Sequence, residues 1–182
     1  MTEGADVSQV SQTTVQRVTA DLYVEVQQFY ARQMPLLEAR KLEEFLETLT
    51  EDGSIEHRPG GWKLEGRRQL LTEMQARRGD PERPLVEEIS AREAREQNVS
   101  YYDGLVYRYW FDRMHIEPVG EDTLKVRYQA IVSMTDAAGK VSFEPTTVVD
   151  DVLVRIGGAL YTRSRVVTHD SPAWADKIHN PS

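Results

Sequence analysis

The spacing of apolar residues changes once along this chain, near Asn98, and the change restricts the folds that the chain can adopt. Before Asn98, apolar residues recur at intervals of three and four, which places them on one side of an α-helix. After Asn98 they alternate with polar residues, as in strands that bury one face. Helices followed by a meander of strands predict the α+β class, with the helices packed on one face of the sheet.

The helical half contains three clear patterns and a weaker fourth. Apolar spacing predicts helices over residues 18–37, 42–49, 66–78 and 84–97. Pro35 is expected to kink or interrupt the first helix, and Asp52-Gly53 is expected to end the second. A brief strand over 54–57 and a turn at Pro59-Gly60-Gly61 then lead to the third helix.

The alternating half predicts strands over residues 105–117, 123–134, 141–156 and 160–168. Gly157-Gly158 predicts a tight hairpin between the last two, because glycine adopts the positive φ angles that such turns need. The strand over 123–134 has a clear apolar face, and burying that face against the helices points Tyr128 into the interior.

The overall charge and the lack of cysteine exclude several classes of function. The chain has 30 acidic and 22 basic side chains, a formal net charge of -8, and no compensating cluster of Lys or Arg. We therefore expect neither nucleic acid nor an anionic membrane as a partner. The absence of cysteine excludes disulfides and thiolate catalysis. The first residues are acidic and no apolar run approaches the ~20 residues that span a bilayer, so we expect a cytoplasmic protein.

Cofactor motifs and long linkers are also missing from the sequence. No phosphate-binding loop, dinucleotide fingerprint or two-histidine metal motif is present, so we expect neither a cofactor nor a bound metal. Residues 1–17 and 173–182 are predicted to be tails, which leaves one domain over residues 18–172.

Six segments of the chain, taken in order, carry a resemblance to a known family. They are Tyr23–Met34 with Leu36–Ala39, Leu49–Gly53, Gly66-Arg67, Tyr109-Trp110, Asp150–Arg155 and Arg165–Asp170. Together they resemble the SnoaL-like members of the nuclear-transport-factor-2-like superfamily, which also holds scytalone dehydratase and the small subunits of ring-hydroxylating dioxygenases. The resemblance implies a cone-shaped domain, whose curved mixed or antiparallel sheet is covered on its concave face by three to four helices. It also implies a conical pocket that works without metal or coenzyme.

The resemblance further indicates which side chains face that pocket. It places Tyr107, Tyr109 and His115 on the pocket side of the strand over 105–117, and the scytalone dehydratase pattern has catalytic histidines where Tyr109 and Tyr128 stand. A phenol, with an ordinary pKa of about 10, cannot replace those histidines as a proton-transfer group at neutral pH. It can still donate a hydrogen bond to a developing enolate oxygen.

Asp151 is the predicted proton-transfer residue. The resemblance places Thr147 and Asp151 on the pocket side of the strand over 141–156, with Thr147 as a substrate contact. Desolvation in an apolar cone would disfavour the charged carboxylate and favour general acid–base chemistry. The alternative is a structural ion pair between Asp151 and Arg113 or Arg165.

The histidines and large aromatic residues supply the remaining candidates. His115 is a candidate base near Glu117, and His57 is a candidate at the mouth of the cone, although both are also consistent with an exposed rim position. His169 is assigned to a turn that ends a strand. An aromatic wall that stacks a planar ligand is predicted from Tyr30, Trp62 and Trp110, and the alternative for these residues is ordinary core packing.

These features favour a cofactor-independent cyclase, dehydratase or isomerase that acts on a polyketide-like carbonyl compound. Asp151 and His115 would transfer protons, Tyr109 and Tyr128 would hold the oxygen, and a small apolar or aromatic molecule would be the substrate. A homodimer is the expected assembly. Two other functions fit the same residues: a non-catalytic small subunit of a ring-hydroxylating oxygenase, and a protein that binds and shields a reactive ligand.

Overall fold

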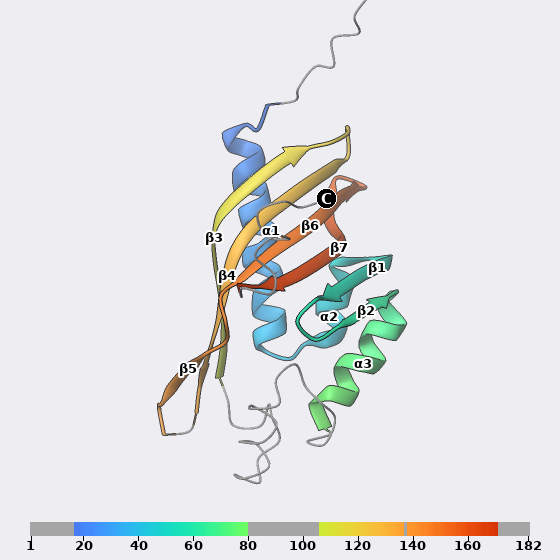
Figure 1. Cartoon of the computed structure of the whole chain (residues 1–182). Coiled ribbons are helices and arrows are strands. Elements are labelled where there is room, and N and C mark those ends of the chain that lie inside the picture. Colours follow the sequence, from blue (N-terminus) through green and yellow to red (C-terminus); the bar gives the residue numbers. More distant parts are fainter. Residues whose placement is uncertain (1–16, 80–105, 137, 171–182) are drawn as a thin grey trace, which may run out of the picture.

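A curved sheet with helices on its concave side forms the computed structural model, which describes residues 17–79, 106–136 and 138–170 (Figure 1). The helices are α1 (Ala20–Glu38), α2 (Leu42–Glu47) and α3 (Arg67–Gly79). The strands are β1 (Leu49–His57), β2 (Trp62–Glu65), β3 (Val106–Pro118), β4 (Thr123–Thr135), β5 (Val141–Phe143), β6 (Thr147–Ile156) and β7 (Ala159–His169). The predicted α+β class is confirmed, with the addition that β1 and β2 lie between α2 and α3 in the chain.

The strands form one mixed sheet. Their order is β2-β1-β7-β6-β4-β3. The short strand β5 lies outside this order and pairs with β4. Only the pair of β1 and β7 is parallel among the described strands, and the other pairs are antiparallel. The hairpin between β6 and β7 turns at Gly157 and Gly158, whose φ angles of 59° and 85° confirm the glycine requirement.

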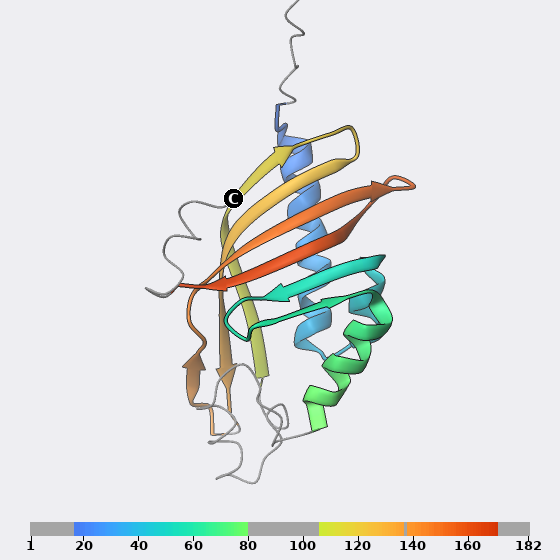
Figure 2. The same ribbon diagram turned by 45° about the vertical axis from the view of Figure 1, so that its right-hand side comes forward.

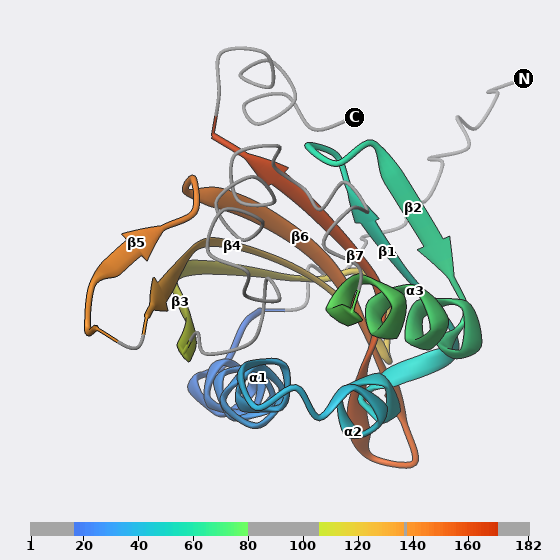
Figure 3. The same cartoon turned by 90° about the horizontal axis from the view of Figure 1, so that it is seen from below.

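The helices cover the concave face of the sheet. In Figure 2, α1 (blue) runs across the strands, and Figure 3 shows α1, α2 and α3 together opposite the curved sheet. Thr19 caps α1 by accepting a hydrogen bond from the Leu22 backbone, and Pro35 lies within the helix rather than ending it. Val26 and Tyr30 of α1 are fully buried against Tyr128 and Leu153 of the sheet.

A second apolar cluster is formed by α2, α3, β1 and β2. It contains Phe45, Leu46, Leu49, Ile55, Leu64 and Leu70. The cluster around α1 and this second cluster are the two parts of the core among the described residues, and residues of both line an apolar cavity.

Two predicted elements differ from the structure. The second helix ends at Glu47, and Asp52-Gly53 lies inside β1, because the residues from Leu49 onward pair with β7 far along the chain. The predicted strand over 141–156 is two strands, β5 and β6, since the segment around Pro145 leaves the sheet between them. The predicted helix over 84–97 and the predicted tails, apart from residue 17, lie outside the described residues.

A β-bulge in β3 reverses part of the predicted pocket face. The register with β4 shifts between Asp112 and His115, and Arg113 has a φ of 54°. Two residues of β3 therefore lie opposite one residue of β4, and the alternation of inward and outward side chains changes at this point. Ile116 is buried, whereas Arg113 and His115 are exposed. The predicted inward orientation of His115 is thus wrong.

Replacing Arg113 with Gly is expected to stabilise the fold by up to about 1 kcal/mol, because glycine adopts a left-handed conformation without a steric penalty. The free energy of unfolding from urea titration would measure this change. Lys125→Gly, at an exposed position within the regular part of β4, is the matched control and should be destabilising. A loss of stability in Arg113→Gly would contradict the assignment of strain to this bulge.

Candidate active site

A largely apolar cavity of about 270 Å³ lies between the helices and the sheet. Helical residues Met34, Phe45 and Leu70 form one wall, and Phe111 and Val149 belong to the opposite wall on the sheet. The tyrosine side chains predicted to face inward, Tyr107, Tyr109 and Tyr128, all line the cavity. The alternation of β3 before its bulge and of β4 throughout explains this common orientation.

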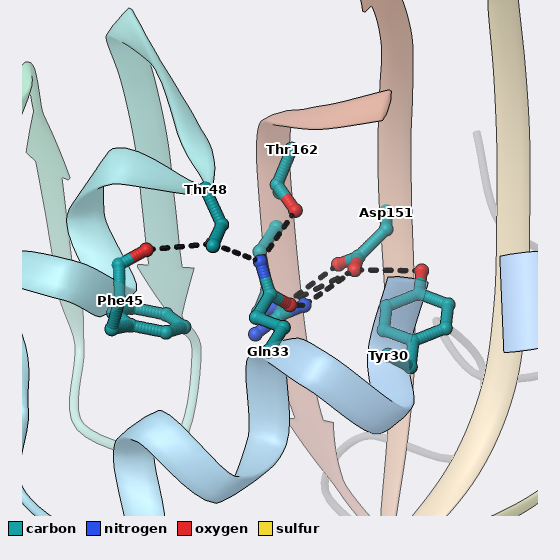
Figure 4. Close-up of polar contacts among 7 residues, drawn as sticks. Tyr30, Gln33, Phe45, Thr48, Asp151 and Thr162 are labelled. Atoms are coloured by element: carbon teal, nitrogen blue, oxygen red, sulfur yellow. Dashed lines mark hydrogen bonds and ion pairs between the residues drawn. The ribbon is translucent and has the colours of Figure 1, made fainter. Parts of the chain in front are cut away.

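A buried ion pair lies at the base of this cavity. Nε of Arg165 donates to Oδ1 of Asp151 at 3.0 Å, and Nη2 of Arg165 donates to Oδ2 at 2.7 Å. The Tyr30 hydroxyl also donates to Oδ2 of Asp151, at 2.9 Å (Figure 4). Asp151 and Arg165 are direct neighbours in the β6–β7 register, which brings the two side chains together on the concave face.

Gln33 connects this ion pair to helix α2 and strand β7. Its Oε1 accepts from Nη2 of Arg165 at 2.6 Å, and its Nε2 donates to the hydroxyls of Thr48 at 2.7 Å and Thr162 at 3.1 Å. Thr48 in turn donates to the Phe45 carbonyl at 2.6 Å (Figure 4). Gln33 and Thr162 are almost fully buried, so the network is shielded from solvent and holds Arg165 from two sides.

Burial and pairing determine the charge state of this network. Burial disfavours the charged form of Arg165, but the charge and hydrogen bonds of Asp151, together with Tyr128 and Tyr30, outweigh that effect and hold the pKa of Arg165 above its ordinary value. Burial also raises the pKa of Tyr128 and, together with the Asp151 charge, that of Tyr30. Both phenols therefore stay neutral and act as hydrogen-bond donors, and the charge of Arg165 is balanced by Asp151.

Two donors next to this network have no partner within the described part of the protein. Arg165 and Tyr128 both line the cavity, and neither Nη1 of Arg165 nor the Tyr128 hydroxyl forms a hydrogen bond with any described residue. The two groups are close enough that the Arg165 charge opposes the rise in the pKa of Tyr128. Both residues line the cavity, where a ligand oxygen can accept hydrogen bonds from these donors.

Two imidazole rings form another polar part of the cavity wall. The His57 ring stacks on Trp62, with ring centroids 5.3 Å apart, and meets the His169 ring edge-on at 5.2 Å. Nδ1 of His57 accepts a hydrogen bond from the Gly60 backbone at 3.0 Å, so the proton of the neutral ring is assigned to Nε2. His57, Trp62, His169 and Glu144 all line the cavity.

The structure brings most of the predicted site residues to one cavity. Tyr107, Tyr109, Tyr128, His57, Trp62 and Thr147 line it. Tyr30 and Asp151 lie behind the wall, where Asp151 forms the ion pair with Arg165 that was the alternative interpretation of this residue. Asp151 is therefore not placed to exchange a proton with a ligand in the cavity.

Trp110 and His115 differ from the predicted arrangement. Trp110 borders the cavity, but the residue is 59% exposed and its indole Nε1 donates to Ser133 on the outward face of β4. Its ring therefore does not form the predicted aromatic wall. His115 lies opposite Arg127 on the outer face of the sheet, because the bulge at Arg113 shifts the alternation. It is not among the residues of the cavity.

Sequence reasoning did not place three polar residues in the cavity wall, and it considered Arg165 only as an ion-pair partner of Asp151. Arg165 and His169 lie on the same face of β7 as Val167, which stands between them at a spacing of two residues, and all three line the cavity. The period of two extends to His169, which is the last residue of β7 and not part of the turn that the sequence predicts there. Glu144 follows β5 in a segment predicted to be continuous strand, and no local pattern pointed to it.

Comparison with known proteins places the chain in a family. The model of the SnoaL-like domain family matches residues 18–166. Aln2 from a Streptomyces species is 32% identical, with a TM-score of 0.66 and coverage of 85% of this chain and 95% of Aln2. ActVI-ORFA from Streptomyces coelicolor is 28% identical, with a TM-score of 0.66 and coverage of 82% of this chain and 98% of that protein.

A protein from Catenulispora acidiphila, solved in complex with S-DNPA, is 30% identical, with a TM-score of 0.63 and coverage of 86% of this chain and 99% of that protein. Comparison with curated protein sequences found no significant match. Within the described part of the chain, every helix is too short or too polar to cross a bilayer. The match over most of the chain, together with these related structures, shows that the protein belongs to the SnoaL-like domain family.

Proposed function

We propose that this protein is a small-molecule enzyme of the cyclase, dehydratase or isomerase type, which binds an aromatic, polyketide-like carbonyl compound in the cavity. The observation that carries the proposal is that Tyr128 and Arg165 line a largely apolar cavity with two donors, the Tyr128 hydroxyl and Nη1 of Arg165, that have no partner among the described residues. Donors held in position in a dry site stabilise negative charge that develops on a carbonyl oxygen during enolisation. The family membership and the complex of the Catenulispora acidiphila relative with S-DNPA support a small-molecule ligand.

The charge balance of the site favours a carbonyl oxygen over a carboxylate. Asp151 already neutralises Arg165, so a ligand that carries a full negative charge gains little electrostatic attraction. A neutral carbonyl can accept hydrogen bonds from both donors and gains more as its oxygen becomes negative in the transition state. The same donors would stabilise the enolate that forms when a proton leaves the adjacent carbon.

Proton transfer requires a second group that exchanges protons near neutral pH. Among the described cavity residues, the imidazoles of His57 and His169 have this property. In the proposed mechanism, Tyr128 and Arg165 hold the carbonyl oxygen, an imidazole exchanges the proton, and Asp151 positions Arg165. Thr147 and Tyr109 shape the space between these groups.

The activity can be tested with 2-tetralone, a bicyclic ketone with acidic protons next to its carbonyl. The protein is expected to accelerate exchange of these protons with deuterium in D₂O, measured by proton NMR. Tyr128→Phe should lower the protein-catalysed rate about 10- to 100-fold, because it removes one donor to the enolate oxygen. The Tyr128 hydroxyl has no partner among the described residues, so the variant should remain folded.

Tyr23→Phe, on the solvent-exposed side of α1, is the matched control and should leave the exchange rate unchanged. A protein that only shields its ligand would bind the ketone without accelerating exchange. That result, or an unchanged rate in Tyr128→Phe, would exclude the proposed use of this oxygen site.

A further inference from the structure

We propose that Ala130 is a specificity-determining residue of the cavity, and that it limits how bulky the ligand can be beside its carbonyl group. The inference rests on the proposed function, in which Tyr128 and Arg165 bind the carbonyl oxygen. It adds the place where the body of the ligand lies, a depression in the concave face of the sheet that is formed by Ala130 and Thr147.

Cross-strand pairing places the side chains of this depression in one row. Residues that pair directly in antiparallel strands lie on the same face of the sheet. The row crosses β3, β4, β6 and β7 and contains Phe111, Ala130, Thr147 and His169, all of which line the cavity. Two small side chains thus lie between two aromatic rings, and the surface of the sheet in this row is lowest at Ala130 and Thr147.

The depression lies directly beside the oxygen site. Ala130 follows Tyr128 by two residues on the same face of β4, which separates their Cα atoms by about 7 Å. In the other direction along β4, Val126 is buried in the apolar cluster around α1 and is not among the residues that line the cavity. A ligand whose carbonyl oxygen contacts Tyr128 therefore extends over Ala130.

The floor of the depression is apolar and fixed in position. The Thr147 hydroxyl donates to the Pro145 carbonyl at 3.3 Å, so the polar group of Thr147 is used within the protein. Ala130 belongs to a strand with neighbours on both sides, β3 and β6, which hold its backbone in place. The helices contribute Met34 and Met74, whose unbranched side chains adjust to the shape of a ligand. The size limit is therefore set on the sheet, at Ala130.

Ala130→Leu tests the proposal, because it adds three carbon atoms to the floor of the depression. The two substrates are cyclohexanone, which is a single ring, and 2-tetralone, in which the same ketone ring is joined to a benzene ring. The ratio of kcat/KM for 2-tetralone to kcat/KM for cyclohexanone, from proton exchange in D₂O, should fall at least about tenfold in the variant. Ala130→Val, which adds two carbon atoms, should give a smaller fall. An unchanged ratio in Ala130→Leu would overturn the proposal.

Two further measurements separate this result from other effects. Ala159→Leu makes the same substitution at an exposed residue at the start of β7 and should leave the ratio unchanged. Ala130→Leu should unfold at a urea concentration no lower than that of the unmodified protein, because the added carbon atoms enter cavity space and remove apolar surface from water. A lower midpoint would show that position 130 is packed and does not border space for a ligand.

Binding and exchange fail independently. The affinity for 2-tetralone, measured by isothermal titration calorimetry, should fall about tenfold in Ala130→Leu, and an unchanged affinity would reject the role of Ala130. If the unmodified protein binds 2-tetralone without accelerating exchange, the enzymatic function is rejected, and the affinities alone decide the role of Ala130. If the unmodified protein does not bind 2-tetralone, both proposals are rejected.

Discussion

Replacing Asp151 with Asn is expected to lower the free energy of unfolding by about 3–5 kcal/mol, which is a large part of the stability of a typical domain. The variant leaves the guanidinium of Arg165 buried without its counter-charge, and Arg165 is only 6% exposed. An Asn amide also places N–H groups where the carboxylate accepts hydrogen bonds from Arg165 and Tyr30. Urea unfolding followed by circular dichroism would measure the change.

Two controls separate the loss of charge from other effects. Asp151→Leu combined with Arg165→Met removes both charges and should recover most of the lost stability, because no buried charge remains unpaired. Glu25→Gln breaks the surface pair with Arg155, where Glu25 has a side-chain exposure of 38%, and should cost at most about 1 kcal/mol. An Asp151→Asn variant as stable as the unmodified protein would show that Asp151 does not balance Arg165.

This expectation changes how activity data for Asp151 would be interpreted. A loss of activity in Asp151→Asn is expected from displacement of Arg165 and from reduced stability, and not from the loss of a proton-transfer group. The activity of the variant therefore has to be compared with its ligand affinity and with the fraction of folded protein. Tyr128→Phe, which leaves the ion pair intact, is the more direct test of the oxygen site.

Replacing Gln33 with Leu is expected to lower the free energy of unfolding by roughly 2–4 kcal/mol, because a buried polar group that loses its partner costs about 1–3 kcal/mol. Leucine keeps most of the side-chain volume but removes the acceptor for Nη2 of Arg165 and the donor to Thr162. Thr48 retains its hydrogen bond to the Phe45 carbonyl, so its loss is smaller. Thermal and urea unfolding would both report the change.

Gln27→Leu is the matched control for this substitution. Gln27 lies on the same helix, and its side chain bonds to Tyr23 on the exposed side. A change of less than about 0.5 kcal/mol is expected there, as for most surface substitutions. If Gln33→Leu were no more destabilising than Gln27→Leu, that result would contradict the conclusion that Gln33 stabilises the buried position of Arg165.

Local patterns in the chain were sufficient to predict the order of most elements and the inward face of β4. The spacing of apolar residues in α1 gives one buried side that includes Val26 and Tyr30, and alternation in β4 gives a buried Tyr128. Both conclusions need only the helix and strand periods, because burial of an apolar face selects the orientation of the whole element. The glycine pair at the β6–β7 turn is likewise a local requirement of backbone geometry.

The chemistry of the cavity depends on pairings between distant segments. The family resemblance placed Asp151 on the concave face, but only the register of β6 with β7 put Arg165 beside it and made it an ion-pair partner. The bulge at Arg113, which turned His115 to the outside, arises from the pairing of β3 with β4. His57 and His169 meet because β1 and β7 are parallel neighbours. The strand period of two determines which face of the sheet a side chain lies on. The residues beside it on neighbouring strands depend on hydrogen bonding between segments far apart in the sequence. Those neighbours are therefore determined only when the sheet assembles.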